Sequence, residues 1–350
     1  MSQLSPVFIV GCPRSGTYLL LKLISENFDF ASPIETHFIP YFRRYSFLYG
    51  NLEKESNRAR LVNAIFDFLN IWTPIMMQSN DRQIYFEESL LSIENEKNKI
   101  VKNSRSFETV VAAIFNSFAE KKKKKSWVDK SAFFECLDIS KTTTALSGSK
   151  VIHIVRDGRD VACSWVETWH GPQNVVSAAM KWKKHVESKR SWGEANPDLY
   201  LEIKYEELVS EPQRILGRVA LFLKTEIGSP LDTEKRGNEL GKALSILQSH
   251  TLINANVTDK RIGRHAKSLS PTQVNDIESC IGRTLKYFGY QSVYRRKTLK
   301  QSTKILWVAC SDAFSKNAIL RFIKSVLPII LWAFGLIGIK FPRTYIKLAE

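Results

Sequence analysis

Cysteine is scarce in this sequence, and the 5 cysteines follow no recognisable pattern. None of them forms a C-x-x-C pair and their number is odd, so neither a disulfide framework nor a zinc site is predicted. Reduced thiols in a cytoplasmic protein are the expectation. Residues 1–6 also lack the basic segment and the cleavage site of a signal peptide. With only 12 prolines and 16 glycines, extensive disorder is not expected either.

Acidic residues are outnumbered, but the basic excess is confined to a few places. The chain has 51 Lys and Arg against 35 Asp and Glu, which gives a formal charge of +16. Residues 295–350 hold 11 basic and 2 acidic residues, and five lysines form the run Lys121–Lys125. The nearly neutral remainder argues against nucleic acid as a partner and for local sites that bind phosphate or anionic lipid. The lysine run itself is interpreted as a solvated loop.

The C-terminal region contains an apolar stretch that is too short for a simple membrane span. Val326–Ile339 has 14 residues without a charge and includes one proline and two glycines. As a helix it would reach about 21 Å, which is less than the ~30 Å hydrocarbon core of a bilayer. We therefore expect residues 320–345 to make peripheral contact with the inner face of a membrane. The alternative is packing on the rest of the protein or on the partner in a homodimer.

The order of apolar segments predicts an α/β protein. With 350 residues, 44% of them hydrophobic, the chain can bury one large core or two small ones. A strand, a glycine-containing turn and a helix open the sequence, as they do in open parallel sheets. Strands are expected at Val7–Val10, Lys150–Val155 and Tyr200–Lys204, with a short extended piece at Glu35–Pro40.

These elements predict a P-loop-like open parallel sheet flanked by helices. The pattern of residues 41–125 is mostly helical and indicates a helical insertion beside the sheet. Residues 1–295 are expected to form one domain built on this sheet. Residues 296–350 are expected to add a basic, apolar C-terminal helical extension.

A glycine-bracketed loop, Gly11-Cys-Pro-Arg-Ser-Gly16-Thr17, lies between the first strand and the first helix. Backbone N–H groups and the helix dipole make such a loop an anion site. The glycines have the Walker A spacing, but Thr17 and Tyr18 replace the lysine and the Ser/Thr that grip triphosphate and Mg²⁺. Arg14 supplies positive charge instead, so a metal-free nucleotide fits better than Mg-ATP. The alternative is an ordinary turn with a surface arginine.

A second anion site is predicted at the end of the strand Lys150–Val155. Arg156 follows this strand, and Ser164 lies eight residues further on in the next helix. A guanidinium and a hydroxyl can meet at one phosphate if the chain reverses after Arg156. The alternative is that Arg156 pairs with Asp157 or Asp160 and that Ser164 faces solvent.

The two loops together resemble the sulfotransferase family that uses 3′-phosphoadenosine 5′-phosphosulfate (PAPS). P-R-S-G-T-Y-L-L at 13–20 and V-R-D-G-R-D-V-A-C-S-W at 155–165 are similar to its two phosphate-binding motifs. The motif layout is most similar to that of tyrosylprotein and carbohydrate sulfotransferases, and it covers residues 5–292. Further similar segments are E-T-H-F-I-P at 35–40, W-V-D-K-S at 127–131, Y-E-E-L-V at 205–209 and K-R-I-G-R at 260–264.

Three departures from the family pattern stand out. Tyr18 occupies a position where Ser or Thr is usual, so one phosphate-binding hydroxyl is lost. Ser131-Ala132 replaces the usual Thr-Pro after Lys130. The cytosolic branch of the family has a histidine base in the slot that Ala132 fills here, so the base must come from elsewhere.

The resemblance implies in-line transfer of a sulfuryl group from PAPS to an acceptor hydroxyl or amine, without a metal. Glu35 would be the general base, with His37 as the alternative, and Lys130 would stabilise the leaving oxygen unless it only pairs with Asp129. Arg14 would hold the 5′-phosphate and the transferring group. The remaining cofactor-binding residues implied by the resemblance are Ser15, Gly16, Thr17 and Tyr18 in the loop, and Arg156, Ser164, Tyr205, Arg261 and Arg264 at the 3′-phosphate.

The acceptor carries no motif and is left open as a small molecule, a glycan or a lipid. The competing hypothesis is a small-molecule phosphotransferase, a kinase that uses the same loop. A non-catalytic nucleotide-binding protein is a third. The missing Walker lysine argues against the second hypothesis, and the presence of Glu35 and Lys130 argues against the third.

Overall fold

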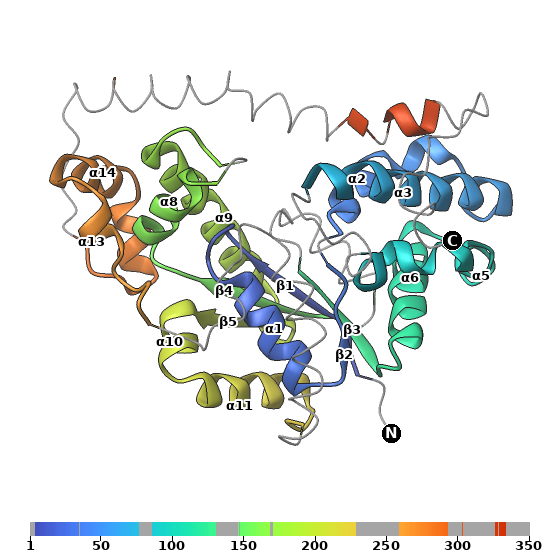
Figure 1. Cartoon of the computed structure of the whole chain (residues 1–350), viewed down its shortest axis with the longest axis horizontal. Helices are drawn as coiled ribbons and strands as arrows, with labels where there is room; N and C mark the ends of the chain where they lie inside the picture. Colours follow the sequence, from blue (N-terminus) through green and yellow to red (C-terminus); the bar gives the residue numbers. More distant parts are fainter. Residues whose placement is uncertain are drawn as a thin grey trace.

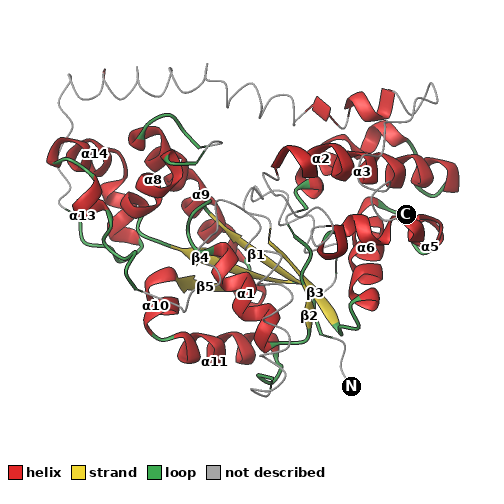
Figure 2. Cartoon of the chain, viewed as in Figure 1, coloured by secondary structure: helices red, strands yellow, loops and turns green. Residues whose placement is uncertain are grey.

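A computed structural model describes most of the chain. The described residues are 4–34, 36–76, 86–130, 146, 148–168, 171–228, 259–292, 303, 326–327 and 329–333, with the side chains of 72–76 left aside. Five parallel strands form one sheet in the order β2-β3-β1-β4-β5 (Figures 1 and 2). The predicted α/β fold with an open parallel sheet is confirmed. The strands are β1 (Val7–Gly11), β2 (Phe30–Ala31), β3 (Ser126–Lys130), β4 (Lys150–Val155) and β5 (Tyr200–Lys204).

The sheet is buried on both faces, which explains the near-continuous apolar runs of its central strands. Every residue of β1 is buried. Because successive side chains of a strand point to opposite faces, Phe8 and Val10 enter one core cluster and Val7 and Ile9 enter another. Such a strand is stable only between two layers of helices.

One face of the sheet is covered by helices that follow β1 and β5. These are α1 (Thr17–Asn27), α10 (Tyr205–Ser210) and α11 (Pro212–Leu223). In α11, Ile215, Leu216, Val219 and Leu223 are buried at helical spacing against the same cluster as Leu20, Leu21 and Ile24 of α1. The glycine-bracketed loop at residues 11–17, called the phosphate loop below for its predicted role, is therefore followed by a helix that is anchored along its length.

Helices between β2 and β3 pack on the other face and gather at one side of the molecule (Figure 1). They are α2 (Phe38–Tyr45), α3 (Glu55–Met76), α5 (Lys97–Lys102) and α6 (Phe107–Lys121). The extended piece predicted at Glu35–Pro40 is wrong for residues 38–40, which form the first turn of α2. Pro40 is tolerated there since the first turn of a helix needs no N–H from it. The division into domains at residue 295 stays a prediction.

Opposite this group, helices that follow β4 form a third cluster. They are α8 (Gly158–Val166), α9 (Val175–Ala195), α13 (His265–Ser268) and α14 (Pro271–Tyr287). The cluster includes Val155 at the end of β4 and the fully buried Trp182 of α9. Trp182 Nε1 donates to the carbonyl of Arg156 at 3.0 Å, which fixes the backbone where β4 ends.

Part of the C-terminal extension lies among the described residues. Leu327 and Leu331 are buried in the same cluster as the helices between β2 and β3. They are four residues apart, the spacing of one helix face. Among the residues that the structure describes, no helix is both long and apolar enough to cross a bilayer. Peripheral membrane contact through residues 320–345 stays a prediction.

The lysine run is not a free patch of charge. Lys122 forms an ion pair with Glu88 at 2.5 Å, and Lys121 Nζ donates to the carbonyl of Ser92 at 2.7 Å. Lys124 and Lys125 lie 4.0 Å and 3.7 Å from the carboxylate of Asp29. The run therefore lies at a surface with acidic and carbonyl partners around it.

Candidate active site

The carboxyl ends of the parallel strands meet at one edge of the sheet, where α/β proteins bind their ligands. β1 lies between β3 and β4, so the strand order reverses at β1. The register pairs Ile9 with Lys130 and Gly11 with Ile154. The loop after β1 therefore has the end of β3 on one side and the end of β4 on the other.

Two glycines of this loop are required by close contacts. A Cβ on Gly11 would lie 2.8 Å from the carbonyl oxygen of Ile154 in β4. Gly16 has a φ of +90°, and a Cβ there would lie 2.4 Å from the ring of Tyr205. A larger residue at either position would push the loop away from its neighbours. The Gly16 contact brings Tyr205, at the start of α10, against the loop.

The N-terminal end of α1 is arranged for an anion. Gly16 is its N-cap residue and offers no side chain to the first backbone N–H groups. The hydroxyl of Ser15 is buried, and no hydrogen-bond partner lies near it among the described residues. Arg14 has a positive φ of 71°, an uncommon conformation for this residue. A helix start without a side-chain cap and a buried hydroxyl together fit a phosphate or sulfate group.

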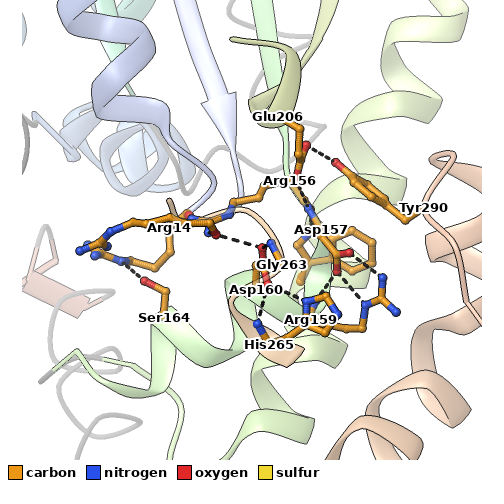
Figure 3. A network of polar contacts seen from close by, with 12 residues as sticks. Arg14, Arg156, Asp157, Arg159, Asp160, Ser164, Glu206, Gly263, His265 and Tyr290 are labelled. Atoms are coloured by element: carbon orange, nitrogen blue, oxygen red, sulfur yellow. Dashed lines mark hydrogen bonds and ion pairs between the residues drawn. The ribbon is translucent and has the colours of Figure 1, made fainter. Parts of the chain in front are cut away.

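The structure joins the two predicted phosphate sites. Arg14 Nε donates to Ser164 Oγ of α8 at 3.1 Å, and Arg156 Nη1 donates to the carbonyl of Arg14 at 3.3 Å (Figure 3). Arg156 also lies over the ring of Tyr205, with Cζ 4.4 Å from the ring centroid. The resemblance assigned Arg14 to the 5′ end of the donor and the other residues to its 3′-phosphate. In the folded chain they line one continuous polar region.

Three arginines gather in this region. Burial lowers the pKa of Arg14, and the nearby charges of Arg261 and then Arg156 lower it further. Arg156 is buried, and its Nε has no hydrogen-bond partner among the described residues. Like charges at short range raise the free energy of the folded chain unless anions lie among them. The cluster therefore indicates a site for an anionic ligand.

Arg261 reaches this cluster because Asp160 anchors its segment. Asp160, fully buried in α8, accepts from the backbone N–H of Gly263 at 2.8 Å and of His265 at 2.9 Å (Figure 3). The carbonyl of Arg261 accepts from Arg156 Nη2 at 2.6 Å. Neither contact was foreseen from the sequence, because about one hundred residues separate the partners.

Asp160 also bears on the alternative interpretation of Arg156. Arg156 Nη2 lies 3.6 Å from Asp160, so the two do form an ion pair, whereas Asp157 is occupied by Arg159 at 2.7 Å. Burial tends to raise the pKa of Asp160, but hydrogen bonds from the side chain and backbone of His265, and the charge of Arg156, outweigh burial and lower it. Asp160 is thus a charged anchor at neutral pH.

Replacing this anchor should weaken both folding and ligand binding. In Asp160→Asn the charge is lost and the amide cannot accept from all of the N–H groups around it. We expect the free energy of unfolding to fall by about 2 kcal/mol, measured by urea denaturation at neutral pH. Binding of adenosine 3′,5′-diphosphate should weaken about tenfold, since Arg261 is no longer held.

The pH dependence of this effect has a defined sign. Because the folded-state pKa of Asp160 is lowered, its contribution is present above the unfolded value of about 3.9 and is lost as the pH falls through the lower folded value. The stability difference between the wild type and Asp160→Asn should therefore shrink in acid. The exposed Asp198→Asn is the matched control. An equal loss in both variants would contradict the anchor role.

Glu206 is a second residue whose contribution was missed. It follows Tyr205 in the Y-E-E-L-V segment, and its carboxylate accepts from the N–H of Asp157 at 3.1 Å and from the hydroxyl of Tyr290 at 2.9 Å. It therefore holds the turn that follows Arg156 (Figure 3). A glutamate directly after a predicted binding tyrosine was the available signal.

Lys130, the last residue of β3, lies on the other side of the loop. It is 4% exposed, and its Nζ lies 3.9 Å above the ring centroid of Tyr18. Its neighbour Asp129 is fully buried and accepts from Thr36 Oγ1 at 3.1 Å. Because successive strand residues point to opposite faces, Asp129 and Lys130 are directed to different sides of the sheet.

Not every predicted residue joins the arginine cluster. Arg264 forms an ion pair with Glu167, so a carboxylate holds its guanidinium in this structure. Glu35, Ser131 and Ala132 lie outside the described residues. On the two sides of Glu35, the N–H of Ile34 donates to the carbonyl of Glu88 at 3.0 Å and Thr36 is held by Asp129. The catalytic assignment of Glu35 stays a prediction.

A glycine-bracketed loop at the strand-order reversal, with an arginine inside it and no Walker lysine, is typical of an anion-binding site in a P-loop-like α/β protein. Residues 6–228 match the model of the sulfotransferase family. The chain belongs to this family, and its reaction is sulfuryl transfer. Neither the family nor the site favours the phosphotransferase alternative.

Solved structures share the fold. The sulfotransferase domain from the olefin synthase of Synechococcus PCC 7002 is 17% identical, with a TM-score of 0.57 over 84% of this chain and 98% of that one. The sulfotransferase domain from the curacin biosynthetic pathway is 18% identical, with a TM-score of 0.56 over 83% of this chain and 100% of that one. No curated protein sequence matches the chain.

Proposed function

We propose that the protein is a PAPS-dependent sulfotransferase that acts on an acceptor hydroxyl or amine. The observation that carries this proposal is the joined anion site, in which Arg14, Arg156 and Arg261 lie beside the uncapped start of α1. A nucleotide with phosphate groups on both its 5′ and 3′ positions has two anionic ends for such a site. Metal independence stays part of the proposal.

The residues present fit the two ends of this donor. The N–H groups of Gly16 and Thr17, with Arg14 and the hydroxyl of Ser15, would hold the 5′-phosphosulfate. The N–H of Ser15 already donates to the carbonyl of Cys12 at 3.1 Å. Arg156, Tyr205 and Arg261 would hold the 3′-phosphate, with Ser164 within reach because it already contacts Arg14. Arg264 would join them only by leaving Glu167.

When bound, the donor supplies an activated sulfuryl group, and the protein's part is positioning and charge stabilisation. The ammonium of Lys130 would stabilise negative charge on the oxygen that leaves. Arg14 would neutralise charge on the transferring group. The carboxylate of Glu35 would accept the proton of the acceptor. The burial of Lys130 strengthens its interaction because little water screens the ammonium.

Ligand-dependent stabilisation tests the proposal. Adenosine 3′,5′-diphosphate at about one hundred times its Kd should stabilise the fold by about 2.7 kcal/mol, a rise in Tm of about 4 °C for a chain of this size. Adenosine 5′-monophosphate is the control for the 3′-phosphate. Stabilisation by ATP with Mg²⁺ alone would favour a kinase and contradict the proposal. Transfer of labelled sulfate from PAPS to a panel of phenols, alcohols, glycans and lipids would then identify the acceptor.

The acceptor class remains open among small molecules, glycans and lipids. A cytoplasmic location, contact of residues 320–345 with the inner face of a membrane, and a homodimer are further proposals. Basic residues around the apolar stretch 326–339 support the membrane contact. The burial of Leu327 and Leu331 supports packing on the helices between β2 and β3 instead.

A further inference from the structure

Tyr18 stands where the motif that the sequence resembles has Ser or Thr. In the structure, the ring of Tyr18 contacts the side chain of Lys130. Tyr18 lies in the first turn of α1 and is 7% exposed. Lys130 Nζ lies 3.9 Å from the centroid of its ring. This distance is well within the range of a cation–π contact, which strengthens when both partners are desolvated.

A buried ammonium needs such a partner. Lys130 is 4% exposed at the end of β3, where water cannot solvate its charge fully. A lysine side chain also has four flexible carbon–carbon bonds, so its ammonium takes many positions unless neighbours restrict it. The flat ring of Tyr18 offers one face to the ammonium and thereby limits where it can lie.

The position of Tyr18 in the chain ties this contact to the phosphate loop. Tyr18 comes two residues after Gly16, whose backbone is fixed against Tyr205. A residue in the first turn of α1, directly after the loop, thus contacts a lysine of β3.

We propose that Tyr18 is a positioning residue that holds the Lys130 ammonium beside the phosphate loop. In place of the direct phosphate contact of a Ser or Thr hydroxyl, this protein has an indirect one through the lysine. The inference rests on the proposed function, in which Lys130 stabilises the leaving oxygen.

Substitutions that separate the ring from the hydroxyl test the inference. Tyr18→Phe keeps the ring and should transfer sulfate at a rate within about threefold of the wild type. Tyr18→Leu keeps an apolar side chain without a π face and should slow transfer about 10- to 30-fold. Transfer of label from PAPS to water can be followed without knowing the acceptor: water attacks sulfur, the bond to the 5′-phosphate oxygen breaks, and sulfate, adenosine 3′,5′-diphosphate and a proton are released.

A ligand-free measurement tests the contact itself. Urea denaturation of Tyr18→Leu, Lys130→Met and the double variant forms a double-mutant cycle. We expect the Tyr18→Leu substitution to lower the midpoint clearly when Lys130 is present and much less when it is methionine. The matched control is another lysine–aromatic pair, away from the loop. Lys150 Nζ lies 5.1 Å from the ring centroid of Phe222. Phe222→Leu should leave the rate of transfer unchanged.

The outcomes separate this inference from the function on which it rests. If the wild type transfers label but Tyr18→Leu transfers it equally fast, Tyr18 does not position Lys130 and the sulfotransferase proposal stands. Additive effects in the denaturation cycle would overturn the inference as well. If the wild type neither binds adenosine 3′,5′-diphosphate nor transfers label, the proposed function fails, and the role of Tyr18 fails with it.

Discussion

Glu35→Gln should slow sulfuryl transfer by about 10²- to 10⁴-fold, because an amide of the same shape cannot take up the acceptor's proton. Binding of adenosine 3′,5′-diphosphate should stay within about twofold, since a residue that acts on the acceptor contributes little to donor affinity. Initial rates with labelled PAPS and calorimetric titration with the diphosphate give the two quantities separately.

The control for this variant is the alternative base, His37. This residue is buried and begins α2 with a φ of 52°, a conformation that asparagine also tolerates. His37→Asn should therefore keep the fold and most of the rate. Full activity in Glu35→Gln, together with a large loss of activity in His37→Asn, would show that His37 is the general base and that the assignment to Glu35 is wrong.

Arg156→Ala should weaken binding of adenosine 3′,5′-diphosphate by about 100-fold or more, the usual result of truncating one partner of a buried charge-assisted contact. Its guanidinium donates hydrogen bonds to the carbonyls of Arg14 and Arg261 and lies over the ring of Tyr205. Arg156→Lys retains the charge but loses the forked geometry, so its affinity should be intermediate. Isothermal titration measures all three proteins.

The control variant Arg214→Ala tests whether the loss of one positive charge alone weakens binding. Arg214 is an exposed arginine of α11 that pairs with Glu207 and Glu211. Its removal changes the charge of the protein equally and should leave the affinity unchanged. A fall in affinity that is similar in Arg156→Ala and Arg214→Ala would mean that the ligand senses only the overall charge, and the assigned 3′-phosphate site would be wrong.

The phosphate loop and Arg156 were predictable because each follows an apolar strand that the sequence shows clearly. A charged residue directly after a buried strand lies at the sheet edge whatever the strand order is. The same argument reaches Tyr205, which follows β5. Strand order itself was not predictable, since the pairing of β1 with β3 depends on contacts between residues more than one hundred positions apart.

β3 shows why other parts escaped prediction. Its sequence, S-W-V-D-K, places two ionisable residues in five, a pattern that does not indicate a buried strand. Asp129 and Lys130 are nevertheless buried, because Thr36 and Tyr18 stabilise them from other elements. The anchoring of residues 263–265 by Asp160 is equally non-local. Such partners become apparent only after the chain has folded.

The hydrogen bond between Thr36 and Asp129 affects which parts of the chain can change in length. Thr36 precedes α2, and Asp129 follows α6 in β3. Their hydrogen bond therefore joins the start and the end of the helical segment between β2 and β3, next to Lys130. Because this junction is held by a buried hydrogen bond, changes of length among the intervening helices need not displace Lys130 or the loop after β1.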